Sequence, residues 1–187
     1  AAENWVRRQH LASSVKVVPE ILPSLDACIR SVEKSLGFRK NSVDCYLFNS
    51  GDIQASCAAA QISSSPLLLL SSQMVRMLSD AELQFVIGHE LGHYIFRHPI
   101  DADDSAGSPG MHLRKLARQR CAEISCDRIG LLATNDIDIA VRALLKTVTG
   151  LPDEFLRFDV SAILKQINEL RNLGGSPAEA LSTHPMF

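Results

Sequence analysis

The sequence lacks the long apolar run that a membrane-spanning helix requires, and it has no excess of positive charge. Its longest apolar stretch, 66–70, is far shorter than the roughly 20 residues needed to cross a bilayer. The formal net charge of the 187 residues is -2, whereas proteins that bind phosphate backbones carry a basic surplus. We therefore expect no membrane span in this chain and no nucleic-acid partner.

The sequence also lacks a disulfide framework and a signal peptide. Its cysteines are odd in number and include no Cys-x-x-Cys pair, so we interpret all of them as small core residues in a cytoplasmic or other reducing compartment. The amino end has charged residues and no apolar block, although a start at Ala1 rather than Met leaves room for targeting or membrane segments removed from the chain. The five cysteines are Cys28, Cys45, Cys57, Cys121 and Cys126.

A chain of this length, 46% hydrophobic, fits one domain, 1–187, with a sizeable core. Apolar spacing of three and four residues predicts helices, and short β-branched or apolar runs predict strands. We expect an α+β fold, mainly helical, with a small three-stranded mixed or antiparallel sheet that precedes the helix beginning at Asp80. Strands are predicted at 43–48, 54–60 and 66–70, and helices at 21–36, from Asp80 to near Pro99, at 112–134, at 136–149 and at 153–173, with a mobile loop at 101–110.

The helix from Asp80 contains His89-Glu90-Leu91-Gly92-His93. Ser79 followed by Glu82 forms a capping box that predicts its start. Positions four apart project from the same helix face, so the imidazoles of His89 and His93 can converge on one metal ion. Glu90 is rotated by about 100° from His89 and can reach a water at that ion as a base.

A catalytic zinc site needs a third protein ligand. Glu123 is the candidate, because it lies four residues before Asp127 on the flank of an apolar helix face, where an unpaired carboxylate is costly. Asp127 is then placed to accept the second ring N–H of a ligand histidine. The alternative is a solvated helix face in which both carboxylates pair with Arg120 and Arg128.

Gly88 and Gly92 lie inside the same helix. Each glycine costs about 1 kcal/mol relative to Ala in a helix interior, so we expect another helix or the substrate to approach closely there. His10, His98 and His112 receive no role.

Three motifs, in this order, resemble the gluzincin peptidases of the HtpX-like and CAAX-prenyl-protease family. They are His-Glu-x-x-His at 89–93, Glu-x-x-x-Asp at 123–127 and Ser-Thr-His-Pro at 182–185. Arg-His at 97–98 and the helix entry at 79–83 are also similar to that family. The resemblance spans most of the chain and is strongest to the minimal soluble catalytic domains called minigluzincins.

The resemblance implies one zinc ion per chain, with His89, His93 and Glu123 as ligands, Glu90 as the general base and His184 as a candidate for stabilising the oxyanion. The implied activity is a zinc-dependent endopeptidase that hydrolyses extended or unfolded polypeptide by means of a zinc-activated water. The alternative is a latent or inactive zinc-binding module whose cleft holds its own tail, 174–187, or a partner protein. In either case we expect a peptide or protein partner.

Overall fold

A computed structural model describes residues 12–58, 65–98 and 109–172. The chain divides into two compact units. The first comprises residues 1–99 and 126–156, and the second comprises residues 100–125 and 157–187. The predicted loop at 101–110 falls almost entirely outside the described residues, and the tail 174–187 lies wholly outside them.

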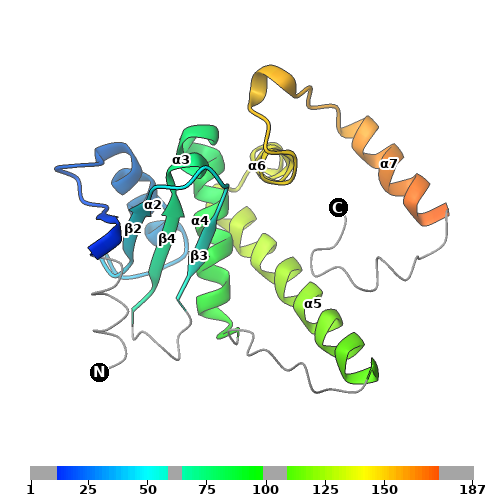
Figure 1. Cartoon of the computed structure of the whole chain (residues 1–187), viewed down its shortest axis with the longest axis horizontal. Coiled ribbons are helices and arrows are strands. Elements are labelled where there is room, and N and C mark those ends of the chain that lie inside the picture. Colours follow the sequence, from blue (N-terminus) through cyan, green and yellow to red (C-terminus); the bar gives the residue numbers. More distant parts are fainter. Residues whose placement is uncertain (1–11, 59–64, 99–108, 173–187) are drawn as a thin grey trace. The chain divides into compact units, whose positions relative to one another are not determined.

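The sheet of the first unit is mixed, in agreement with the expected α+β fold, and it has four strands in the order β1-β2-β4-β3 (Figure 1). β2 and β4 are parallel, whereas β1 and β3 pair antiparallel with their neighbours. Three strands match the predicted ones, and β3 lies at an edge of the sheet. The strands are β1 (Val15–Lys16), β2 (Asp44–Phe48), β3 (Ala55–Cys57) and β4 (Leu67–Ser71).

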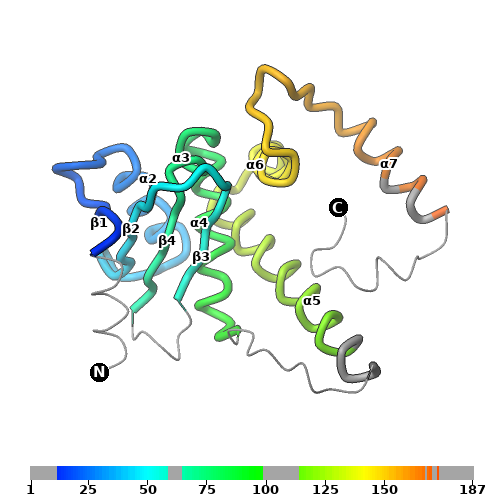
Figure 2. Tube along the Cα trace, viewed as in Figure 1, coloured from blue at the N-terminus to red at the C-terminus, as the bar shows by residue number. Residues whose placement is uncertain are grey.

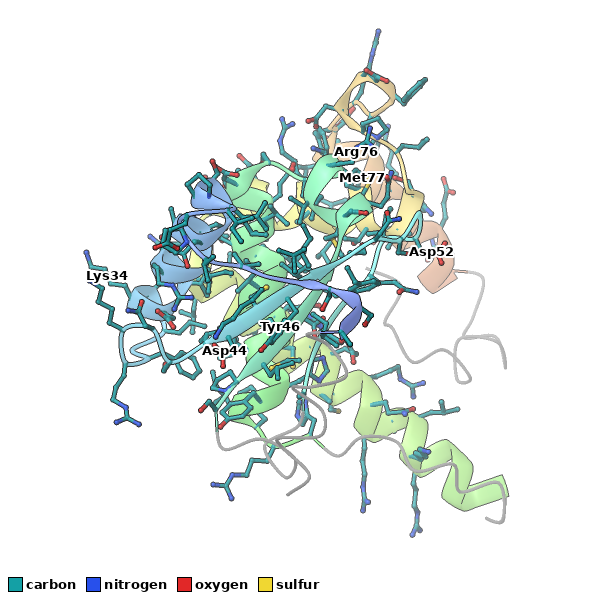
Figure 3. All side chains as sticks on the ribbon, turned by 60° about the vertical axis from the view of Figure 1, so that its left-hand side comes forward. Lys34, Asp44, Tyr46, Asp52, Arg76 and Met77 are labelled. Carbon is teal, nitrogen blue, oxygen red and sulfur yellow. The ribbon has the colours of Figure 1, made fainter. Side chains whose placement is uncertain are left out.

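The prediction of three strands missed β1. Both of its residues are exposed, so no apolar alternation marks it in the sequence. It is held by pairing with β2 and by an ion pair in which Lys16 Nζ lies 2.8 Å from Asp44 Oδ1. Asp44 and Tyr46 lie two residues apart on β2 (Figure 3).

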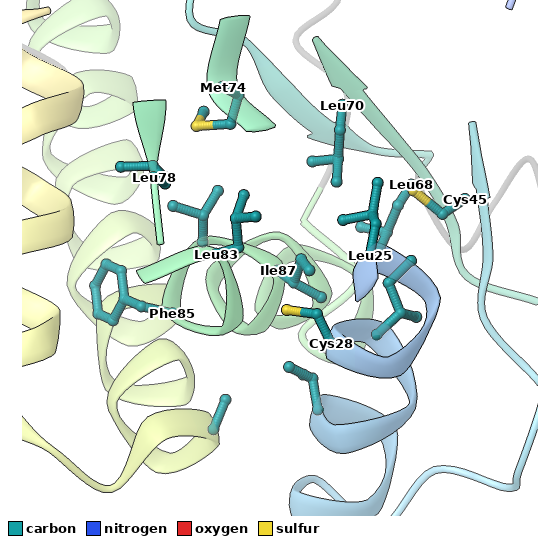
Figure 4. Close-up of a cluster of buried hydrophobic side chains, with 14 of the residues drawn as sticks. Leu25, Cys28, Cys45, Leu68, Leu70, Met74, Leu78, Leu83, Phe85 and Ile87 are labelled. Carbon is teal, nitrogen blue, oxygen red and sulfur yellow. The ribbon is translucent and has the colours of Figure 1, made fainter. Parts of the chain in front are cut away.

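The hydrophobic core of the first unit lies between the sheet and two helices, α2 (Pro23–Ser35) and α4 (Asp80–Ile95). Side chains from α2, α4 and the strands converge there, as Figure 4 shows. Leu67, Leu68 and Leu70 of β4 are fully buried, and because neighbouring strand residues point to opposite faces, both faces of this strand are covered. The buried surface therefore fixes α4, which contains both candidate histidines.

α4 begins at Asp80 as the capping box predicts. The Ser79 amide donates to Glu82 Oε2 at 2.8 Å, and the Glu82 amide donates to Ser79 Oγ at 3.4 Å. A short helix, α3 (Ser72–Met77), comes just before it and is not predicted by the sequence. Figure 2 traces this part of the chain from β4 through α3 into α4.

α6 (Ile137–Thr149) packs against α4 and is hydrogen-bonded to its first turn. Lys146 is 1% exposed and donates to Glu82 Oε2 at 2.8 Å and to Asp153 Oδ2 at 2.7 Å. Burial acts to lower the pKa of Lys146, but the hydrogen bonds to Asp153 and Glu82 outweigh it, so the pKa is raised. Lys146 therefore stays charged and ties α6 to the first turn of α4.

The remaining helices are α5 (Pro109–Thr134) and α7 (Val160–Asn172). The predicted helix at 153–173 was wrong in its first part. Asp153–Phe155 forms a separate 3-10 turn, and α7 starts where Asp159 Oδ1 accepts from the amides of Ser161 and Ala162 at 2.9 and 3.2 Å. Within the described part of the chain, no helix is both long and apolar enough to cross a bilayer.

Candidate metal centre

His89 and His93 lie one turn apart on α4 and are both half-buried. Their Nε2 atoms are 3.2 Å apart. Two nitrogens bound to one tetrahedral zinc at about 2.0–2.1 Å would be separated by about 3.3 Å. The pair therefore fits a zinc ion without rearrangement of the helix.

The second ring nitrogen of His89 contacts a carboxylate. His89 Nδ1 lies 2.8 Å from Asp127 Oδ1, and Asp127 is on α5. A carboxylate accepts only, so Nδ1 carries the proton and Nε2 keeps its lone pair. The structure thus brings Asp127 to the atom at which an outer-shell partner would act.

The second ring nitrogen of His93 contacts another histidine. His93 Nδ1 is 3.1 Å from His98 Nδ1, and His98 Nδ1 is 3.7 Å from Cys126 Sγ. The sequence analysis assigned His98 no role, because histidines next to a helix end are commonly exposed or capping residues. The helix ends at Ile95, and the similarity of Arg-His at 97–98 to the gluzincin family was a sequence signal that could have drawn attention to His98.

Cys126 is fully buried and lies beside the histidine pair. Among the described residues, the donor atoms of His89, His93 and Cys126 lie within 4.8 Å of one another, which makes them a group that could hold a metal. Glu123 is half-buried on α5, one helical turn before Asp127. Ligation by Glu123 stays a prediction.

Glu90 is half-buried on α4, and its charge reaches the edge strand β3. Burial raises the pKa of Cys57 on β3 to about 12, and the nearby Glu90 carboxylate adds to the rise. The Cys57 thiol therefore stays protonated at neutral pH and does not compete as a nucleophile. α4 packs against β3, and the Glu90 carboxylate is close enough to Cys57 of that strand to affect its pKa.

The two helix glycines mark a close approach between helices, one of the two explanations that the sequence left open. A Cβ at Gly88 would lie 2.7 Å from Ala133 Cβ, and a Cβ at Gly92 would lie 3.0 Å from Cys126 Cα. Such distances leave no room for a side chain, so the part of α5 that begins at Cys126 packs directly on α4. This packing brings Asp127 to His89.

The remaining sequence predictions fare differently. His184 lies outside the described residues. All five cysteines are free, but the core interpretation was wrong for Cys121, which is exposed. Cys121 and Cys126 are about 140° apart around one helix, so the turn that buries one directs the other away.

Comparison with known proteins agrees with this geometry. Residues 22–108, which contain α2, three of the four described strands and α4, match peptidase family M48. This stretch, just under half of the chain, is similar to members of that family. M48 metallopeptidases are zinc enzymes. The two imidazoles of His89 and His93 are donors that suit the same metal.

One M48 relative is plastoglobule-localized metallopeptidase 48, chloroplastic, from Arabidopsis thaliana. It is 30% identical over 127 residues, which cover 60% of this chain and 37% of the relative. The chain thus spans well under half the length of that protein. No solved structure gives a significant match.

Proposed function

We propose that this chain is a zinc-dependent endopeptidase that hydrolyses extended or unfolded polypeptide, with one zinc ion held by His89, His93 and Glu123. The observation that carries the proposal is the 3.2 Å approach of the two Nε2 atoms. The Asp127 contact supports it, because it leaves the metal-facing nitrogen of His89 unprotonated. Helical spacing supports Glu123, which lies one turn from Asp127 on α5.

When bound, zinc supplies a Lewis acid that activates water and polarises a carbonyl group. Glu90 takes the proton from the attacking water and returns it to the leaving amine, because its carboxylate follows His89 on the same helix. His184 and Tyr94 are the candidates for donating to the developing oxyanion. Asp127 keeps the His89 ring in one tautomer throughout.

The edge strand β3 supports an extended substrate. Among the described strands, β3 pairs only with β4, so its other side offers main-chain groups. A peptide that adds to such an edge gains main-chain hydrogen bonds whatever its sequence. β3 also packs against α4, which would hold the peptide beside Glu90.

The alternative function is a latent or inactive zinc-binding module, whose cleft holds its own tail or a partner. The observation in its favour is the buried thiol of Cys126 beside His89 and His93. A zinc ion with four protein ligands is typical of structural sites, whereas catalytic sites keep one position open. The free cysteines support a reducing compartment for either function, cytoplasmic or other.

The deciding experiment compares wild type, Glu90→Gln and the control Glu154→Gln, which changes an exposed carboxylate of the 3-10 turn. Each protein is assayed for zinc content and for cleavage of an unfolded polypeptide. Glu90→Gln is expected to keep its zinc and to lose activity by about 10²–10⁴-fold. Glu154→Gln is expected to match wild type.

Equal cleavage rates in wild type and Glu90→Gln would refute the mechanism. Zinc-loaded wild type without activity, together with Cys126→Ala that gains activity, would instead favour the closed zinc module.

A further inference from the structure

α4 ends in a turn whose left-handed position is usually occupied by glycine but here by Arg97. The Arg97 amide donates to Tyr94 O at 3.2 Å, and the His98 amide donates to His93 O at 3.0 Å. This pair of bonds is the Schellman motif, which normally has glycine in the left-handed position. Here Arg97 occupies that position with φ 53°, at a cost of about 1–2 kcal/mol. The chain accepts local strain to turn back immediately after the metal-binding helix.

The strained turn places the ring of His98 against the ring of His93. Besides the 3.1 Å contact between their Nδ1 atoms, the two rings meet edge to face with centroids 5.2 Å apart. Phe96 stacks on His98 with ring centroids 5.6 Å apart and an interplanar angle of 27°. The Cys126 thiol lies 3.7 Å from His98 Nδ1. Contacts on several sides therefore hold the ring of His98 in one orientation.

We propose that His98 is a positioning residue for His93, the neutral counterpart of Asp127 at His89. The inference rests on the proposed function, because it concerns the zinc ligand His93. If neutral His93 binds the metal through Nε2, its Nδ1 carries the ring proton. His98 Nδ1 then accepts that proton in a hydrogen bond, and His98 carries its own proton on Nε2. Each ligand imidazole thus has its own acceptor, a carboxylate for His89 and an imidazole for His93.

The contacts place His98 behind His93 and not beside the metal. The ring nitrogen of His93 that meets His98 is Nδ1, whereas the nitrogen that meets His89 is Nε2. Cys126 Sγ lies 3.7 Å from the same nitrogen of His98, and it also lies within the group of donor atoms that could hold a metal. An outer-shell partner such as His98 is typically worth 10–100-fold in metal affinity.

The test measures the zinc affinity of the full chain by competition with a chromophoric chelator. His98→Ala removes the acceptor, and His98→Phe removes it but keeps the stacking on Phe96. Both are expected to weaken zinc binding by about 10–100-fold. His98→Asn places an amide oxygen where Nδ1 lies, so it is expected to stay within about threefold of wild type. Cys126→Ala, the matched control on the same side, is also expected to stay within about threefold, since the thiol is not a ligand here.

Unchanged affinity in both His98→Ala and His98→Phe would overturn the inference, and so would an equal loss in His98→Asn. A strong loss in Cys126→Ala, with disappearance of a thiolate charge-transfer band from the cobalt-substituted protein, would make Cys126 a ligand and overturn it as well. His89→Ala distinguishes a failure of the proposed metal centre from a failure of the positioning role of His98. If it leaves zinc affinity unchanged, the proposed metal centre fails; if it abolishes binding while the His98 variants remain normal, only the positioning role fails.

Discussion

The two ends of α4 each hold a cluster of polar side chains, and the clusters differ in how their charges are balanced. At the first turn, Glu82 is buried and receives hydrogen bonds from Ser79 and Lys146. At the last turns, His89 and His93 bring two nitrogens within 3.2 Å. Their second ring nitrogens contact the Asp127 carboxylate and the His98 imidazole.

The difference indicates that the cluster around Glu82 stabilises the fold, whereas the cluster around His89 and His93 can bind a ligand. A buried charge is tolerated when it is paired and hydrogen-bonded, and the Glu82–Lys146 pair meets that condition within the protein. The histidine cluster instead directs two electron-pair donors, the Nε2 atoms of His89 and His93, toward one point, while Asp127 contacts the other ring nitrogen of His89. Such an arrangement is stabilised by a cation. The charge of Glu82 in the first cluster is already paired within the protein, and the second cluster is suited to a metal.

The largest effect is expected where the cluster around Glu82 is broken. Lys146→Met leaves the Glu82 carboxylate buried without its cation, and we expect a loss of about 3–5 kcal/mol in the free energy of unfolding. Chemical denaturation measures it. The control is Arg142→Met, because the Arg142 side chain is 43% exposed and its Nη1 lies 3.9 Å from Asp153, a contact worth about 0–1 kcal/mol. Equal losses in the two variants would remove the distinction between the clusters.

A change in the histidine cluster is expected to affect metal binding and to leave the fold intact. Asp127→Asn removes the charge that orients His89, so zinc affinity should fall by about 10–100-fold. The free energy of unfolding of the metal-free protein should change by less than about 1 kcal/mol, because Asp127 is partly exposed. Asp52→Asn, an exposed loop carboxylate, serves as the control. A large loss of metal-free stability in Asp127→Asn would assign that residue to the fold.

The smallest effect concerns the strained turn at the end of α4. Arg97→Gly relieves the left-handed strain, partly offset by the greater entropy of the unfolded chain, and should stabilise the protein by about 0.5–1 kcal/mol. Thermal unfolding measures it. Asn135→Gly is the control, since Asn135 also has a positive φ, 51°, but asparagine tolerates that conformation. Stabilisation by Asn135→Gly as large as that by Arg97→Gly would argue against strain at Arg97.

Much of the fold could be predicted because its signals are local. The capping box of Ser79 and Glu82 predicted the start of α4, and its apolar periodicity predicted the helix. The end of α4 was overestimated, because the turn at Arg97 is held by contacts of His98 with residues from both α4 and α5. The exposed strand β1 was missed because only its partner strand orders it.

The candidate site divides in the same way. The four-residue spacing of His89 and His93 determined by itself that two imidazoles share one helix face, because helical geometry is local. Only the tertiary structure decided that Asp127, 38 residues from His89 in sequence, meets its second nitrogen. That contact depends on two helices whose glycines allow their backbones to approach closely. Such close packing depends on the complementary shapes of two surfaces, and no pattern within either helix contains that information.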